Sequence, residues 1–123
     1  DMTGGSLTYS NRDLIDNERR SIHKGHLRTS ILRALLEEDL KGLDVIRMLE
    51  KVTDGEWKPS PGSLYPMLQE MERASLISGR TSGRSIIYSI TENGRYTISI
   101  LRKDIRKHQR FLDWLMEGED AKL

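Results

Sequence analysis

The sequence contains no cysteine, which excludes disulfide bonds and metal sites that depend on thiolate ligands. No apolar run approaches the roughly 18 residues that a membrane-spanning helix requires, and no secretory signal peptide can be recognised. Aromatic residues are few, with two Trp, four Tyr and one Phe, so the composition does not favour a broad aromatic ligand pocket. We therefore expect a cytoplasmic protein without a membrane segment.

Catalytic patterns are missing as well. The chain shows no nucleophile beside a general base, no glycine-rich loop between a strand and a helix, and no converging carboxylates. His23 and His26 are three residues apart, but no carboxylate cluster completes a metal shell, so structural or surface roles are favoured. We predict that the protein is not an enzyme and needs neither a metal nor a cofactor.

The chain does contain 36% hydrophobic and 32% charged residues in 123 positions, which is typical of one folded domain with a modest core. The net charge of +1 says little about nucleic acid, but the charges are unevenly distributed. Segment 19–33 holds five basic residues and no acidic one, which indicates either a solvated helix face or a supporting phosphate contact. These residues are Arg19, Arg20, Lys24, Arg28 and Arg33.

The most informative stretch is 58–77. Ser60 and Pro61 are typical of a helix start, because serine caps free N–H groups and proline suits the first turn. Apolar residues then recur at steps of three and four, which predicts one buried face. They are Leu64, Met67, Leu68 and Met71. Pro66 leaves two possible helix starts. A start at Pro61 places Pro66 in the helix interior, whereas a start capped by Ser63 keeps Pro66 in the first turn.

Two short β-prone segments flank the Gly/Ser/Arg-rich segment 78–85, and together they predict a β-hairpin. No acidic residue occurs between Arg73 and Glu92, so this hairpin is purely basic. Apolar patterns before residue 58 predict two further helices, at about 25–38 and 43–52. A helix whose N-terminus can bind phosphate, followed by a basic hairpin, is the arrangement of a winged helix-turn-helix.

The same stretch resembles a known family. Segments 59–68 (PSPGSLYPML) and 71–77 (MERASLI) are similar to the PadR-family pattern P-S-P-G-T/S-L-Y-P-x-L followed by L-E-x-x-G-L-I. Segment 88–94 (YSITENG) resembles the family's Y-x-L-T-x-x-G, and the likeness extends from about Gly25 to the C-terminus. There are two departures, since segment 41–46 lacks the His and Tyr of the frequent H-G-Y-E-I and Ser75 replaces the usual glycine.

The resemblance implies a mainly α-helical winged fold with a small hairpin, a role in transcription regulation and double-stranded DNA as a partner. The family positions that match Tyr65 and the neighbouring serines face DNA, so we expect the third helix to enter the major groove with Gln69 and Glu70 near base edges. Basic residues before the helix and in the hairpin are expected to contact phosphates or the minor groove. The predicted DNA-binding residues are Lys58, Ser60, Ser63, Tyr65, Gln69, Arg80, Ser82 and Arg84.

These residues can also have purely structural roles. Tyr65 is then a half-buried packing residue, the serines are only caps, and the arginines flanking the wing tip are solvated charges. A protein-interaction module of the same fold is the alternative function. It requires an exposed apolar patch on the third helix, whereas the predicted outward residues, such as Ser63 and Gln69, are polar. We therefore predict a sequence-specific DNA-binding regulator, a repressor acting on a palindromic operator.

After the hairpin, Thr91 is predicted to cap a helix from Glu92 to about Met116, roughly 37 Å long at about 1.5 Å per residue. Apolar residues and one histidine at alternating steps of three and four predict a heptad seam. These residues are Ile98, Leu101, Ile105, His108, Leu112 and Leu115. Because a small winged core cannot cover so long a helix, we predict a homodimer with this seam as its principal contact.

These patterns divide the chain into three predicted parts: a flexible arm or short helix at 1–20, the winged DNA-binding domain at 21–91 and the dimerisation helix at 92–123. Members of the PadR family often respond to small aromatic molecules near the dimer interface, so the resemblance makes a small-molecule effector a candidate partner. Its candidate contacts, chosen by chemistry alone, are Trp57, Phe111 and Trp114.

Overall fold

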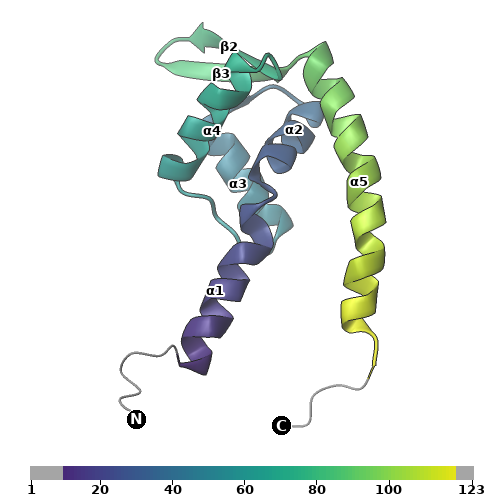
Figure 1. The fold of residues 1–123 in the computed structure, drawn as a ribbon. Coiled ribbons are helices and arrows are strands. Elements are labelled where there is room, and N and C mark those ends of the chain that lie inside the picture. The colour runs from purple at the N-terminus through teal and green to yellow at the C-terminus, as the bar shows by residue number, and fades with distance from the viewer. Residues whose placement is uncertain (1–9, 119–123) are drawn as a thin grey trace.

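The computed structural model describes residues 10–118, apart from the side chain of Lys24, so residues 1–9 of the predicted arm lie outside the described residues. Helices and strands follow in the order α1–α2–β1–α3–α4–β2–β3–α5. The β2–β3 hairpin lies at one end of the molecule, and α5 descends from it along α2 (Figure 1). None of the described helices is long and apolar enough to cross a membrane. The predicted mainly helical winged fold is confirmed.

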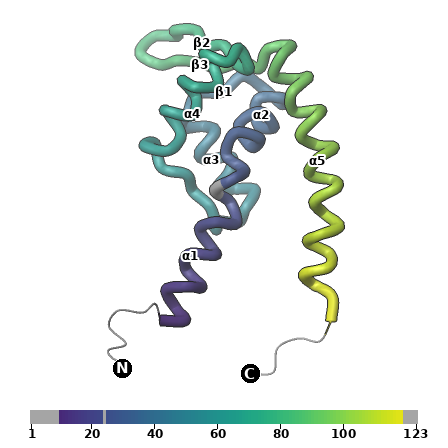
Figure 2. Tube along the Cα trace, in the orientation of Figure 1, coloured from purple at the N-terminus to yellow at the C-terminus, as the bar shows by residue number. Residues whose placement is uncertain are grey.

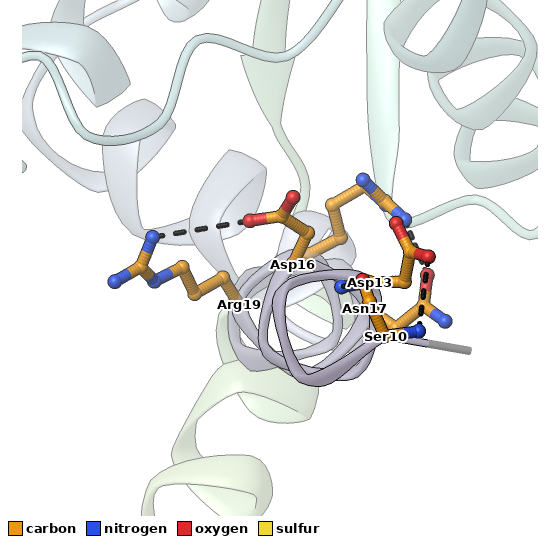
Figure 3. Close-up of polar contacts among 6 residues, drawn as sticks. Ser10, Asp13, Asp16, Asn17 and Arg19 are labelled. Atoms are coloured by element: carbon orange, nitrogen blue, oxygen red, sulfur yellow. Dashed lines mark hydrogen bonds and ion pairs between the residues drawn. The ribbon is translucent and has the colours of Figure 1, made fainter. Parts of the chain in front are cut away.

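Helix α1 (Asn11–Lys24) begins with a reciprocal cap. Ser10 accepts a hydrogen bond from the Asp13 backbone N–H at 3.2 Å, and the Asp13 carboxylate accepts the Ser10 N–H at 3.3 Å (Figure 3). Such a cap satisfies donors that the first turn of a helix otherwise leaves free. The helix projects from the winged core at the end away from the hairpin (Figure 2), and Leu14, Ile15 and Ile22 on it are exposed.

The core lies among α2 (Leu27–Glu37), α3 (Gly42–Val52) and α4, and it includes residues from β2 and β3. The observed α2 and α3 agree with the predicted ranges to within two residues. Each fully buried aliphatic side chain contributes about 1.5–3 kcal/mol to folding. The largest fully buried side chains are Ile31, Leu32, Leu35, Val45, Leu64, Leu68, Met71 and Ile77.

Helix α4 (Pro61–Arg73) begins at the first of the two predicted starts, with Ser60 as its cap and Pro66 inside the helix. Proline at this position removes the N–H that would bond the Gly62 carbonyl. Both Gly62 and Pro66 are exposed, so water can satisfy the carbonyl. The three buried residues of α4 belong to the predicted apolar face, and Met67 of that face is partly buried against the core.

The sheet consists of β1 (Leu40–Lys41), β2 (Ile77–Ser82) and β3 (Ser85–Ile90), in the antiparallel order β1-β3-β2. The hairpin turns through Gly83 and Arg84, where Gly83 has a φ of +63° as the first residue of a two-residue turn. The predicted hairpin is confirmed. Strand β1 was not anticipated, because two residues are too few to show a strand period.

Helix α5 (Glu92–Met116) has the predicted bounds and the predicted cap, since Thr91 accepts the Gly94 backbone N–H at 3.0 Å. Its first turns pack closely on the winged domain. A Cβ at Gly94 would overlap the Leu76 carbonyl oxygen, and Ile98 is buried in the common core. From residue 102 to 118 every residue is exposed.

Candidate nucleic-acid interface

The first turn of α4 presents hydroxyl groups on its exposed side. The Ser60 hydroxyl accepts the Ser63 N–H at 3.2 Å, and it also donates to the Ser63 hydroxyl at 3.2 Å. Both serines and the intervening Gly62 are exposed. A helix start open to solvent can offer hydrogen-bond donors to an anion, and the local dipole favours negative charge there.

Tyr65 combines the two roles that the sequence left open. Its side chain is 38% exposed, yet its ring lies directly against the start of α3. A Cβ on Gly42 would come within 2.8 Å of the Tyr65 Cε1 atom and 2.9 Å of its hydroxyl oxygen. Glycine at position 42 therefore lets the ring pack closely here, and a larger residue would displace the phenol from this place at the surface.

A hollow of about 500 Å³ lies where α4, the start of α3 and the hairpin meet. Tyr65 and Gln69 of α4 line it on one side and Arg84 of the hairpin turn on the other, so three predicted residues come together. Two basic residues that the sequence reasoning missed, Lys41 and Arg47, also line the hollow. Arg47 is paired there with Asp44, whose Oδ1 accepts a hydrogen bond from its guanidinium at 3.1 Å. The only sequence signal for the two basic residues is the position of Lys41 within a family motif, because the topology that brings α3 beside the hairpin is not visible in the chain.

The acidic residues of α4 are engaged within the chain. The Arg28 guanidinium donates to Glu70 Oε1 at 2.9 Å, and Glu72 Oε2 accepts the backbone N–H of Gly79 at 3.0 Å. Glu70, which we expected near base edges, is thus paired with α2. Arg28 is in turn paired with a carboxylate, which weakens its candidacy as a phosphate contact.

The two predicted arginines of the hairpin have different surroundings. Arg80 lies within β2, opposite Ile87, and donates to Asp39 at 3.0 Å and to Ser89 at 2.9 Å. Hydrogen bonds from Ser89 and Arg80 lower the pKa of Asp39 below its ordinary value. Arg84 occupies the turn itself, and it has no ion pair among the described residues.

The other predicted tip residue, Ser82, is exposed next to the turn. Lys58 is exposed in the segment that leads into α4. The preceding Trp57 stacks on His23 of α1, with ring centroids 5.2 Å apart and an interplanar angle of 12°. Thr53 also fixes this segment, because its hydroxyl accepts the Trp57 N–H at 3.0 Å. Trp57 therefore joins the approach to α4 with the end of α1.

The predicted seam of α5 falls into two parts. Ile98 is only 3% exposed and belongs to the core of its own chain, and Leu101 packs partly against that core. Ile98 is therefore unavailable to a second chain. Three aliphatic seam residues further along the helix, Ile105, Leu112 and Leu115, are exposed, as is His108.

The three candidate effector residues are not gathered into one site by the contacts of the described chain. Phe111 lies between His108 and Trp114, with ring centroids 5.5 and 5.9 Å apart, on the exposed part of α5. Trp57 has its aromatic contact with His23 instead. The effector contacts therefore stay a prediction, in two separate places.

Comparison with known proteins decides the family. The model of the "Transcriptional regulator PadR-like family" matches residues 31–100, more than half of the chain. The chain belongs to the PadR-like family of transcriptional regulators. The matched range extends from within α2 to within α5, so it includes α3, α4 and the hairpin.

Individual transcriptional regulators resemble this chain in fold or in sequence. A PadR-like transcriptional regulator from Bacillus cereus has a TM-score of 0.68 at 27% identity, covering 80% of this chain and 99% of its own. A transcriptional regulator from Clostridium thermocellum has a TM-score of 0.74 at 18% identity, covering 79% and 96%. The transcriptional regulator YqjI of Escherichia coli is 33% identical over 71% of this chain, which spans 42% of that protein's length.

The PadR-like motifs of this chain have clear structural roles. Ser75, at the position of the usual glycine, has a φ of +60°, the left-handed conformation that favours glycine. The Leu76 N–H bonds the Met71 carbonyl at 2.9 Å, which completes a Schellman end to α4. Thr91 then links this turn to α5, because its hydroxyl donates to the Ser75 carbonyl at 2.6 Å.

Proposed function

We propose that this PadR-like regulator binds double-stranded DNA with α4 in the major groove and the β2–β3 hairpin on the flanking backbone. The observation that carries the proposal is the hollow beside α4 and the hairpin, which Tyr65 and Gln69 line together with the basic residues Lys41 and Arg84. Cationic groups from separate elements around one hollow suit the phosphate backbone of a duplex.

The acidic residues of α4 support this assignment. A carboxylate directed at DNA repels phosphates, but Glu70 and Glu72 are turned toward Arg28 and Gly79. The outward positions of the helix keep Ser63, Gln69 and Arg73 as exposed polar residues. Gln69 is the candidate for reading base edges, because a side-chain amide can bond adenine in the major groove. The serine hydroxyls and Tyr65 position the helix on the backbone.

A homodimer is the second part of the proposal. Ile105, Leu112 and Leu115 are exposed on α5, with Phe111 and Trp114 beside them. Apolar residues gathered on a long helix at coiled-coil spacing favour a second copy of the same helix. Two-fold symmetry then implies a palindromic operator, and repression follows when the bound dimer obstructs transcription.

A salt titration tests DNA binding. Affinity for the duplex upstream of the protein's own gene is measured against an unrelated duplex of equal length, at several salt concentrations. We expect tighter binding to the first duplex, a steep salt dependence and two protomers per site. Equal and feeble binding to both duplexes contradicts the proposal and favours a protein-interaction module instead.

The hairpin contact is tested by Arg84→Ala. Loss of one phosphate contact weakens binding to all duplexes and reduces the salt slope by about one. Arg12→Ala, on the exposed surface of α1, is the matched control and leaves the slope unchanged. An unaltered slope for Arg84→Ala places the hairpin turn away from DNA.

The hydroxyl contacts are tested by combining Ser63→Ala with Tyr65→Phe. Phenylalanine keeps the ring that packs on Gly42, and the Ser60 cap remains, so thermal stability is preserved. Affinity for DNA is expected to fall about tenfold, since two hydrogen bonds to phosphate are removed. Unchanged affinity assigns both hydroxyl groups to a purely structural role.

A further inference from the structure

Glu72 is an acidic residue on the helix that we place against DNA, and its carboxylate is directed at the hairpin. Tyr65, Gln69 and Glu72 are separated by steps of four and three residues, so they share one side of α4. The first two line the hollow beside the hairpin, and Glu72 continues the same stripe toward the end of the helix. Glu72 is therefore placed where it can contact the hairpin that follows the helix.

The carboxylate binds the backbone of the hairpin. Glu72 Oε2 accepts the Gly79 N–H at 3.0 Å, and Gly79 lies in β2. Strand β2 is at an edge of the β1-β3-β2 sheet, so an N–H on its outer side has no strand partner. Glu72 supplies the acceptor that another strand would provide, and it joins α4 directly to the hairpin.

Gly79 allows this close approach. A Cβ there would lie 2.9 Å from Ile86 Cγ2, 3.2 Å from Tyr88 Cε1 and 3.3 Å from Glu72 Oε2. The bare backbone thus fits between the Glu72 carboxylate and the rings and methyl groups of β3. Burial raises the pKa of Tyr88, and the charge of Glu72 raises it further, in keeping with a carboxylate beside this ring.

We propose that Glu72 is a positioning residue for DNA binding, which sets the separation of α4 and the hairpin through its hydrogen bond to Gly79. Arg84 contacts the DNA phosphates only when the hairpin has this separation from α4, the helix that lies in the major groove. A second connection holds the hairpin across the sheet, where Arg80 of β2 donates to Asp39, the residue before β1. The inference rests on the proposed DNA-binding function.

Two variants of equal charge distinguish the positioning of the hairpin from electrostatic repulsion between Glu72 and the DNA phosphates. Glu72→Gln and Glu72→Ala both remove the carboxylate, but glutamine retains an oxygen that can accept the Gly79 N–H. We expect Glu72→Gln to bind the duplex upstream of its own gene at least as tightly as the wild type. Glu72→Ala should bind about fivefold more weakly than Glu72→Gln, the effect of losing one hydrogen bond. If both variants bind equally tightly, the positioning role is refuted.

A double-mutant cycle supplies a readout that a general loss of stability does not change. Arg84→Ala weakens binding in the wild-type background and has a smaller effect in the Glu72→Ala background, because the hairpin is no longer held. Glu70→Ala is the matched control on the same helix, since Glu70 is paired with Arg28 and does not touch the hairpin. An equal Arg84→Ala effect in the wild-type and Glu72→Ala backgrounds overturns the inference.

Hydrogen exchange of the Gly79 amide tests the connection without DNA. We expect protection in the wild type and in Glu72→Gln, and faster exchange in Glu72→Ala. Equal exchange in all three proteins overturns the inference. A wild-type protein that fails to bind any duplex contradicts the proposed function, and the exchange experiment still decides whether Glu72 holds the hairpin.

Discussion

In α5 the first turns pack against the winged domain, whereas the turns after Leu101 have only exposed residues. Ile98 and Leu112 have the same place in the predicted heptad, two repeats apart, yet they are 3% and 39% exposed. Within one helix, the same apolar pattern therefore serves first as part of the chain's own core and then as an open surface.

The difference teaches what periodicity can and cannot report. A heptad pattern identifies which side of a helix is apolar, because spacing fixes the direction of side chains. It does not identify the body that covers this side. For Ile98 that body is the winged domain of the same chain, and for Leu112 and Leu115 we propose a second copy. Predictions about α5 must therefore distinguish its two halves.

The largest effect is expected at the junction where α5 meets the winged domain. Gly94→Ala places a methyl group on the Leu76 carbonyl oxygen and near Ile90, so the helix must move away. Alanine is the better helix former, but overlap with a backbone atom outweighs this gain. We expect the free energy of unfolding to fall by about 3 kcal/mol in denaturant titrations.

Gly25→Ala is the matched control for this change. Gly25 has a φ of −76°, and a Cβ there meets nothing within 4 Å, so its stability should stay within about 0.5 kcal/mol of the wild type. A Gly94→Ala protein as stable as the control would show that α5 is not held closely at its start.

The comparison between the two halves is tested directly by Ile98→Ala and Leu112→Ala. Truncation of the buried Ile98 costs about 3 kcal/mol through lost burial and a cavity. That loss is intrinsic to the folded chain. Leu112→Ala affects a surface between proposed partners, so it should raise the dimer dissociation constant measured by sedimentation. The melting temperature of this variant should rise with protein concentration over a wider range than that of the wild type.

Two outcomes would break the distinction. If Leu112→Ala leaves the monomer–dimer equilibrium unchanged, α5 does not form the proposed interface. Alternatively, a stability loss for Ile98→Ala that disappears at high protein concentration would mean that Ile98 is covered by a partner. Leu115→Ala serves as a second probe of the exposed half, because its side chain is 54% exposed.

Much of the fold was predictable because local signals agreed with one another. Ser60 and Thr91 cap α4 and α5 as expected, and the bounds of α5 follow from its cap and apolar period. Strand β1 escaped prediction, since it exists only by pairing with Tyr88 and Ile87 across the sheet. Such a strand is specified by tertiary contact rather than by its own two residues.

The candidate interface was predictable only in part. Tyr65, Gln69 and Arg84 were chosen from chemistry and family resemblance, and the fold brings them to one hollow. Lys41 and Arg47 were missed, because they join the hollow through the packing of α3. The pairing of Arg80 with Asp39 was also hidden, since it spans 41 positions of the sequence. Long-range contacts of this kind leave no local pattern.

The smallest expected effect is a gain in stability at the turn after α4, which Thr91 joins to the start of α5. Ser75 ends α4 with a φ of +60°, a conformation that costs a residue with a Cβ about 1–2 kcal/mol. Its carbonyl accepts the Thr91 hydroxyl, a bond that glycine preserves. Ser75→Gly relieves the strain but adds freedom to the unfolded chain, so we expect a net stabilisation of about 0.5–1 kcal/mol in denaturant titrations. Ala74→Gly, one residue earlier with a φ of −82°, has no strain to relieve and should destabilise the protein. If Ser75→Gly is as destabilising as Ala74→Gly, the serine side chain itself stabilises the protein. The serine in place of the family's glycine is then an adaptation of the turn that Thr91 joins to α5.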